Sequence, residues 1–282
     1  MGNISGAIVM TNLIQVGIDI GGTKMLTIAY QHSKIQARSQ ISTGKDFTAA
    51  DAQTEIERFI HTLAAPPDGI GIAIPGLVDR AGVVIACDVL PNLVGWQPAI
   101  AFSSICPVKV VNDAQAALMK VVSELKPQTV AAVVMVGTGI GAAIYANGMV
   151  LSGANGWAGE LGSIPIEGKT LDAQASGAAI LAQLGIDANQ SNALVGANDI
   201  TALQSIERAG TSLGMGLAIL INLLNPETIV LAGGTLQWRG YLAAAMQSTQ
   251  RYSLPDLWAS CRLEVSQHGG DLVGLGAASI AI

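Results

Sequence analysis

Near its start the chain reads Val16-Gly17-Ile18-Asp19-Ile20-Gly21-Gly22-Thr23-Lys24-Met25-Leu26-Thr27-Ile28-Ala29-Tyr30, in which a glycine turn separates two apolar runs. This pattern predicts a β-hairpin. The same arrangement recurs about 115 residues later, where residues 131–136 lead into Gly137-Thr138-Gly139-Ile140-Gly141 and then into residues 142–146. The repetition indicates a duplicated architecture with one glycine turn in each lobe. Two such turns could face one ligand from two sides.

The segments around the hairpins alternate between strand and helix patterns, which indicates an α/β architecture. The expected elements are a helix over 49–64, a strand over 69–74 ending in Pro75-Gly76, a strand over 108–111 ending in Asn112-Asp113, helices over 171–184 and 200–224, the second interrupted near Gly210 to Gly216, a strand over 228–232 and a small-residue helix over 274–282. We expect two lobes, residues 13–113 and 114–273, with the helix over 274–282 folding back on the first.

The composition excludes several classes of protein. Of the 282 residues, 50% are hydrophobic and only 12% are charged, which rules out a disordered chain. The net charge of -6 argues against a nucleic-acid partner, because a nucleic-acid surface needs a surplus of Lys and Arg. The three cysteines, Cys87, Cys106 and Cys261, are widely spaced, so they predict no disulfide framework and fit a reducing cytosol.

The mean hydropathy of +0.48 requires a membrane to be considered, since residues 128–159 contain no charge. A transmembrane helix needs about 20 apolar residues in unbroken sequence. Glycines and the hairpin signal Asn147-Gly148 interrupt this stretch, so it predicts buried strands. Residues 1–11 lack the basic start of a secretory signal. We therefore expect a cytoplasmic protein with no membrane partner.

Asp19 precedes the turn Gly21-Gly22-Thr23-Lys24, and this pattern suits phosphate and Mg²⁺. Glycines let backbone N–H groups approach phosphate oxygens, and a carboxylate offers hard oxygen ligands to a metal or its waters. Gly137-Thr138-Gly139 predicts a second phosphate turn. It does not predict a dinucleotide fingerprint, because a strand follows it where a helix is required. Ordinary hairpin turns are the alternative for both segments.

Asp113 follows a strand and precedes a run of good helix formers, so its simplest role is a helix N-cap. Its other role is a general base, because the carboxyl ends of strands in open α/β sheets face the ligand. Residues 155–162 combine an amide, the Glu160 carboxylate and three glycines, which suits recognition of several hydroxyls. A glycine-rich surface loop is the alternative.

In this order, the motifs resemble the ROK family of bacterial sugar kinases from about residue 16 onward. The motifs that carry the resemblance are Asp19-Ile20-Gly21-Gly22-Thr23-Lys24, Pro75-Gly76, Asn92 with Trp96, Asn112-Asp113, Gly137-Thr138-Gly139 and Gly159-Glu160-Leu161-Gly162. The resemblance implies an α/β, two-lobed actin-like (ribonuclease H-like) ATPase fold around a central cleft. It also implies ATP and Mg²⁺ as cofactors, and a homodimer.

The resemblance further implies roles for single residues. Asp113 would be the catalytic base, and Asp19 would bind Mg²⁺ through water. The N-terminal lobe would carry the first phosphate turn and part of the sugar site. The C-terminal lobe would carry the second turn, the sugar loop and the adenosine site. The sugar hydroxyls would be held by Asn92, Asn112, Asp113 and Glu160, the phosphates by Gly21, Gly22, Thr23, Lys24, Gly137, Thr138 and Gly139, and the adenosine by Gly233 and Gly234.

The chain departs from the family pattern in one region. The family usually carries His where Ser163 stands, followed by a cysteine-rich zinc segment, and here no Cys occurs between Cys106 and Cys261. We therefore expect no zinc, because a closed zinc site needs four N or S ligands. Asp172 corresponds to a family Glu that would face the sugar beside Glu160. The alternative is that Asp172 is only a first-turn helix carboxylate.

These residues favour an ATP- and Mg²⁺-dependent kinase that phosphorylates a hydroxyl of a glucose-like or N-acetylhexosamine-like hexose. One alternative is a non-catalytic sugar sensor, since ROK proteins include transcriptional repressors. Repressors carry a DNA-binding domain ahead of the kinase-like lobes, and here we expect no room for one before Asp19. A catalytically inactive relative is the other alternative, and the retention of Asp19 and Asp113 argues against it. The expected ligands are a sugar and a nucleotide, or polyphosphate as the donor.

Overall fold

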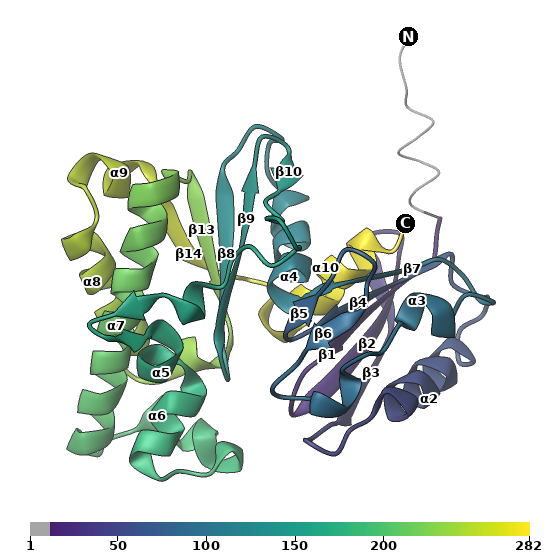
Figure 1. The fold of residues 1–282 in the computed structure, drawn as a ribbon, viewed down its shortest axis with the longest axis horizontal. Helices are drawn as coiled ribbons and strands as arrows, with labels where there is room; N and C mark the ends of the chain where they lie inside the picture. Colours follow the sequence, from purple (N-terminus) through teal and green to yellow (C-terminus); the bar gives the residue numbers. More distant parts are fainter. Residues whose placement is uncertain (1–11) are drawn as a thin grey trace. The chain divides into compact units, whose positions relative to one another are not determined.

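The computed structural model describes residues 12–282, and these form two compact units (Figure 1). Unit 1 contains the described residues up to Glu124, then Ser152–Trp157 and Gly270–Ile282. Unit 2 contains Leu125–Leu151 and Ala158–Gly269. The expectation about a secretory signal falls on residues 1–11, which lie outside the described residues.

Unit 1 is built on a five-stranded sheet of order β3-β2-β1-β4-β7. Strands β1 to β3 are antiparallel, whereas β4 and β7 pair in parallel with their neighbours. The bounds are β1 Gln15–Ile20, β2 Lys24–Gln31, β3 Lys34–Ser42, β4 Gly69–Ile74 and β7 Val108–Asn112. The first predicted hairpin is therefore present, and the strand over 69–74 has the predicted bounds.

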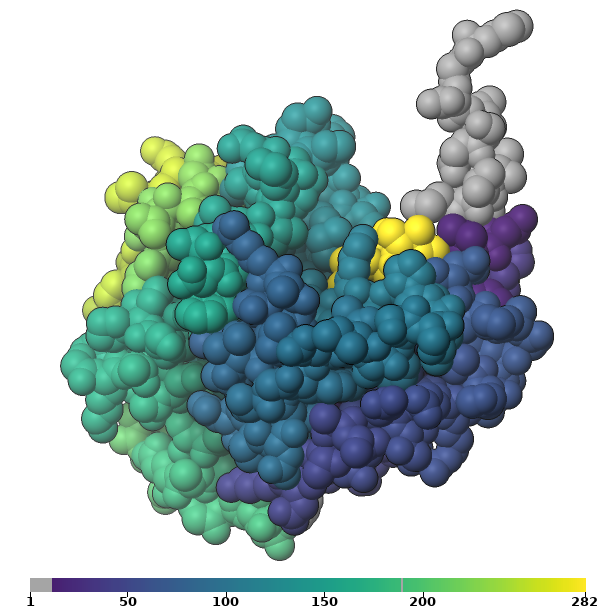
Figure 2. All heavy atoms as spheres, turned by 45° about the vertical axis from the view of Figure 1, so that its right-hand side comes forward, coloured from purple at the N-terminus to yellow at the C-terminus, as the bar shows by residue number. Residues whose placement is uncertain are grey.

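Each face of this sheet is covered by a helix. Val16, Ile18 and Ile20 share a buried cluster with α2 (Ala49–Ile60), which ends four residues before the predicted bound. On the other face α10 (Leu272–Ile280) lies against the backbone of β1 and β4. A Cβ at Gly71 would stand 1.8 Å from the carbonyl oxygen of Ala277, so only glycine permits this approach. In Figure 2, which draws one face of the molecule, only part of α10 (yellow) is visible.

The helix α4 (Asp113–Val122) belongs to unit 1 and packs against α10. A Cβ at Gly276 of α10 would lie 1.7 Å from the carbonyl oxygen of Ala116 in α4. The expected lobe boundary at Asp113 therefore falls on the first residue of a helix that stays with unit 1, and the division comes after Glu124. The remaining elements of unit 1 are short: β5 Leu77–Val78, β6 Val84–Ala86, the 3₁₀ turn η1 Pro91–Leu93 and α3 Pro98–Ala101.

Unit 2 repeats the sheet of unit 1 in the order β10-β9-β8-β13-β14. Again three antiparallel strands are followed by two parallel ones. The bounds are β8 Ala131–Val136, β9 Ile140–Ala146, β10 Met149–Val150, β13 Thr228–Ala232 and β14 Arg262–Val265. Asn147 and Gly148 both have positive φ, 54° and 80°, which forms the tight turn predicted between β9 and β10. The expected duplication is confirmed by the shared strand order.

The helices of unit 2 differ from two predictions. The segment predicted as one helix over 171–184 is divided at Ser176 into α5 Leu171–Ala175 and α6 Gly177–Leu184. The break has a local cause, because the Ser176 side chain accepts the N–H of Ala179 and caps α6.

The expected interruption of the helix over 200–224 is wrong, since α7 (Ile200–Leu224) is continuous. Its glycines allow α8 (Tyr241–Tyr252) to approach closely. A Cβ at Gly210 would lie 2.3 Å from the carbonyl oxygen of Tyr241, and one at Gly214 would lie 2.4 Å from that of Ala245. The other elements of unit 2 are α9 Pro255–Ser260, the ribbon β11 Pro165–Ile166 with β12 Lys169–Thr170, and the 3₁₀ segments η2 Leu161–Ser163, η3 Ala188–Gly196 and η4 Gly234–Gln237.

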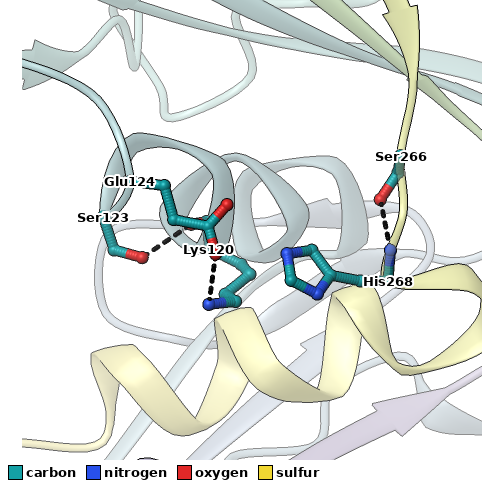
Figure 3. Close-up of polar contacts among 5 residues, drawn as sticks. All are labelled: Lys120, Ser123, Glu124, Ser266 and His268. Atoms are coloured by element: carbon teal, nitrogen blue, oxygen red, sulfur yellow. Dashed lines mark hydrogen bonds and ion pairs between the residues drawn. The ribbon is translucent and has the colours of Figure 1, made fainter.

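Local hydrogen bonds lie next to the first and the last of the places where the chain passes from one unit to the other (Figure 3). After α4, Lys120 Nζ pairs with Glu124 Oε1 at 2.7 Å, and Ser123 Oγ donates to the carbonyl oxygen of Lys120 at 2.7 Å. After β14, the N–H of His268 donates to Ser266 Oγ at 3.2 Å. Within the described residues, no helix is both long enough and apolar enough to cross a membrane.

Candidate active site

The first glycine turn, between β1 and β2, is held from behind by Thr43. Thr43 Oγ1 donates to the carbonyl oxygen of Gly21 at 2.6 Å, and the Thr43 N–H donates to that of Thr23 at 3.1 Å. Gly21 N–H is used within the turn, by the carbonyl oxygen of Lys24 at 2.8 Å. Among the described residues, the N–H groups of Gly22 and Thr23 have no hydrogen-bond acceptor. The turn therefore offers two consecutive donors to an anion.

Asp19 lies at the end of β1 beside this turn. Burial, and then the charge of Asp113, raise the pKa of Asp19 from 3.8 to about 7, although the Lys24 charge lowers it. The two carboxylates are therefore close enough to repel one another. A cation bound there would relieve the repulsion, so the pair fits Mg²⁺. Such an ion takes few protein ligands and keeps several waters, and no cluster of three or more metal-binding side chains occurs between residues 12 and 282.

Asp113 is the first residue of α4, and the cap of that helix is Asn112. The Asn112 side chain accepts the N–H of Ala114 at 2.9 Å, and Asp113 Oδ1 accepts the same N–H at 2.8 Å. The alternative that Asp113 is the N-cap is therefore wrong, because the preceding residue has the extended backbone of a cap. Asn112 Nδ2 also donates to the carbonyl oxygen of Gly76 at 2.9 Å, which ties the helix start to the Pro75-Gly76 turn.

Asn92 lies in η1, on the same unit. Its Nδ2 donates to the carbonyl oxygen of Lys45 at 3.2 Å, in the loop between β3 and α2. The residue is exposed, and its Oδ1 accepts no hydrogen bond from residues 12–282. The structure therefore brings Asp19 and Asp113 within electrostatic reach of one another in unit 1, with Asn112 next to Asp113 at the end of β7. Asn92 lies in the same unit, and its recorded contact is with the loop that carries Lys45.

The second glycine turn, between β8 and β9, is also held through its carbonyl groups. Its internal bond joins the N–H of Gly137 to the carbonyl oxygen of Gly139 at 2.9 Å. The bonds that hold it from behind are Gly177 N–H to Gly137 O at 2.8 Å, Ala178 N–H to Thr138 O at 3.2 Å and Thr235 Oγ1 to Gly137 O at 3.2 Å. In the described part of the chain, the N–H groups of Thr138 and Gly139 have no acceptor, and both residues are exposed. The two turns thus present the same pair of donors.

Asp172 lies in the first turn of α5, and its Oδ1 accepts the N–H of Ile140 at 2.6 Å. Burial raises the pKa of Asp172, and the bond to Ile140 lowers it. Partial burial, and then the charge of Asp172, raise the pKa of Glu160. Glu160 and Asp172 therefore lie within electrostatic reach of one another. Ser163 follows in η2, where its N–H donates to the carbonyl oxygen of Glu160 at 3.1 Å.

Gly233 and Gly234 follow β13, beside the end of β8. Gly233 has φ 120°, and a Cβ there would lie 2.1 Å from the carbonyl oxygen of Val136, so no other residue fits. Gly234 begins η4 and has open space around it. The next residue is Thr235, which bonds the second turn. These glycines therefore adjoin the second glycine turn within unit 2.

Several residues of the site carried no signal in the sequence. Thr43 and Thr235 hold the two turns, and both are separated from them by long stretches of chain. The N–H groups of Gly177 and Ala178, at the start of α6, also hold the second turn, and no local pattern in the sequence indicates this role. Only the repetition of the two hairpins could have suggested that each turn needs an equivalent support.

Comparisons with known proteins agree with this architecture. A family model described as the ROK family matches residues 15–282. A glucokinase of Halalkalibacterium halodurans is 27% identical and covers 95% of this chain and 94% of its own length. An N-acetylmannosamine kinase of Pasteurella multocida is 28% identical over 93% and 94%. A xylose repressor of Bacillus subtilis is 28% identical over 80% of this chain and 65% of the repressor.

Solved structures give the same fold. The ROK hexokinase from Thermus thermophilus has a TM-score of 0.78 and 26% identity, over 95% of this chain and 98% of that one. A ROK family glucokinase from Streptomyces griseus, in complex with glucose and AMPPNP, has a TM-score of 0.79 and 22% identity, over 95% and 99%. The expected actin-like ATPase fold is confirmed.

Proposed function

This chain belongs to the ROK family, and from that premise we propose that it transfers the γ-phosphoryl group of ATP to a hydroxyl of a hexose. One observation carries the proposal: two equivalent turns each present two adjacent N–H groups, and one of them adjoins a pair of coupled carboxylates. Phosphoryl transfer needs such donors and charges held in place, because its catalysis depends on positioning and on neutralising phosphate charge.

In unit 1, Asp113 accepts the proton of the attacking sugar hydroxyl, which makes that oxygen a better nucleophile. Its position at the first residue of α4 supports this role, because the helix start fixes the carboxylate. Asp19 would hold Mg²⁺ through its waters, and the ion would neutralise phosphate charge. Asn92 and Asn112 donate to sugar hydroxyls through the hydrogen-bonding capacity that their contacts with Lys45 and Gly76 leave.

In unit 1, Gly21, Gly22, Thr23 and Lys24 bind phosphate oxygens, and in unit 2 Gly137, Thr138 and Gly139 do the same. Glu160 and Asp172 bind sugar hydroxyls, and Gly233-Gly234 leave space beside the adenosine. A glucokinase and an N-acetylmannosamine kinase among the relatives support a glucose-like or N-acetylhexosamine-like acceptor, and the AMPPNP-bound glucokinase supports ATP as the donor. The family resemblance also supports a homodimer. The widely spaced cysteines support a cytoplasmic protein, and the lack of Cys between Cys106 and Cys261 supports the absence of zinc.

An ADP-release assay tests the proposal. Purified protein is supplied with MgATP and, in turn, glucose, fructose, mannose, N-acetylglucosamine and N-acetylmannosamine, with polyphosphate as a second donor. We expect turnover with at least one sugar and none in excess chelator. If none of the sugars is turned over, the result would favour a non-catalytic sugar-binding protein. The xylose repressor among the relatives supports this alternative.

A further inference from the structure

Asp172 is bonded to the second phosphate turn and not only to its own helix. Its Oδ1 accepts the N–H of Ile140 at 2.6 Å, although the two residues are 32 positions apart. Ile140 directly follows Gly139, whose N–H group is one of the two free donors of the turn. The carboxylate therefore fixes the end of the turn that the other supports do not reach, since these hold Gly137 and Thr138.

The same carboxylate also touches the loop that carries Glu160. A Cβ at Gly162 would lie 2.7 Å from Asp172 Cγ and 2.4 Å from the carbonyl oxygen of Ile140. A Cβ at Gly139 would lie 3.6 Å from Asp172 Oδ2. Asp172 is thus enclosed between the phosphate turn and the Glu160 loop, and the two glycines provide the space. A further methylene group in this side chain would have to displace one of these segments.

The backbone of α5 is fixed at its other end. Tyr241 is fully buried, and its hydroxyl donates to the carbonyl oxygen of Ala175 at 2.6 Å. The N–H of Ser176 donates to the carbonyl oxygen of Asp172 itself at 3.2 Å. These bonds hold the short helix in place, so the Asp172 side chain reaches the turn from a rigid support.

We propose that Asp172 is a positioning residue that joins the phosphate turn of unit 2 to the sugar loop, so that one carboxylate orders the groups that receive both substrates. The names of the two substrates rest on the proposed function. Without this bond, the donors of Thr138 and Gly139 would have to be ordered when the nucleotide binds, which weakens binding.

Two substitutions at Asp172 separate this role from the others. Asp172→Ala removes the acceptor of the Ile140 N–H, whereas Asp172→Asn keeps an acceptor oxygen at the same reach. Asp256→Ala is the matched control, because Asp256 is also a first-turn helix carboxylate of unit 2 and is exposed. Thermal melts verify that each variant is folded. If Asp172→Ala does not fold, Asp172→Glu replaces it, since the longer side chain is expected to displace the turn as well.

Two measurements are made on each variant without sugar: amide hydrogen exchange at Ile140 in the ligand-free protein, and the Kd for Mg·AMPPNP by calorimetry. In Asp172→Ala we expect the protection of Ile140 to fall about tenfold or more and the Kd to rise about 5- to 20-fold, as expected for loss of a hydrogen bond to a charged group. Asp172→Asn and Asp256→Ala are expected to stay within about threefold of the unchanged chain on both readouts.

Unchanged exchange and unchanged nucleotide binding in Asp172→Ala, with only a raised sugar KM, would overturn the proposal and leave Asp172 as a sugar ligand with no role in holding the turn. A small shift in Tm with no other change would also overturn it, in favour of a first-turn carboxylate. If the unchanged chain binds no nucleotide, the proposed function fails, while exchange at Ile140 still decides whether Asp172 holds the turn.

Discussion

In the ligand-free protein, we expect ionisation of Asp19 to lower the unfolding free energy as the pH rises. Asp19→Asn is expected to abolish this fall. The pKa of Asp19 is about 7 in the folded chain, against an ordinary 3.8, because of burial and the charge of Asp113. The folded state therefore holds this proton more tightly than the unfolded state. The resulting stabilisation is complete below about pH 4 and is lost as the pH rises through about 7.

The size of the effect follows from the pKa difference. About 3 pKa units at about 1.4 kcal/mol each give an upper limit of about 4 kcal/mol. Asp19 is partly exposed to solvent, so screening reduces the expected effect to roughly 2–3 kcal/mol. Asn at this position has nearly the same shape and cannot ionise, so its contribution does not change with pH.

Urea denaturation in EDTA, without nucleotide, measures this directly. From about pH 5 to about pH 8, we expect the unfolding free energy of Asp19→Asn to rise by about 2 kcal/mol relative to the unchanged chain. Asp256→Asn serves as the control, because it neutralises an exposed carboxylate. A constant difference for Asp19→Asn over this range would refute the reasoning, because it would mean that Asp19 is already ionised in the folded protein at the lower pH.

Three further results are expected. Gly71→Ala would place a Cβ 1.8 Å from the backbone of α10 and should lower the unfolding free energy by about 3 kcal/mol. Gly196 has open space around it, so Gly196→Ala should change the unfolding free energy by less than about 0.5 kcal/mol. Equal effects of the two variants in denaturant titrations would contradict the packing argument. Glu160→Gln should raise the sugar KM about 5- to 100-fold, because the bonds to sugar hydroxyls are weakened, and should leave the ATP KM within about twofold of its value in the unchanged chain. Steady-state kinetics with both substrates varied measure the two constants. A raised ATP KM with an unchanged sugar KM would mean that Glu160 serves the nucleotide. Elemental analysis of the purified chain should find no stoichiometric zinc, and chelation should leave the Tm unchanged; about one zinc per chain would disprove this.

The strands of the two hairpins and the central strands of both sheets could be predicted from the sequence because their signal is local, whereas the edge strands β3 and β14 were not predicted. Residues 69–74 and 228–232 are apolar runs bounded by turn residues, and β4 and β13 have these bounds. Gly210 and Gly214 misled the prediction for α7 because a glycine in a helix either breaks it or allows a neighbour to approach. The choice depends on α8, which lies beyond the local sequence.

The candidate site divides in the same way. The two glycine turns could be found because glycine and threonine at strand ends form a recognisable pattern. Their supports could not, since Thr235 bonds a residue 98 positions away. The bond from Ile140 to Asp172 is equally non-local. The alternative that Asp113 caps α4 is one residue late, because Asn and Asp are nearly equal as caps and only the backbone conformation distinguishes them.

The central claim is that Asp113 is the base of a sugar kinase, and the kcat of Asp113→Asn tests it most directly. The measurement uses the sugar with the highest turnover, saturating MgATP, and Asp256→Asn as a control that also neutralises a first-turn carboxylate. We predict a fall in kcat of about 10²- to 10⁴-fold for Asp113→Asn, with the Kd for Mg·AMPPNP nearly unchanged. Turnover equal to that of the unchanged chain would contradict it.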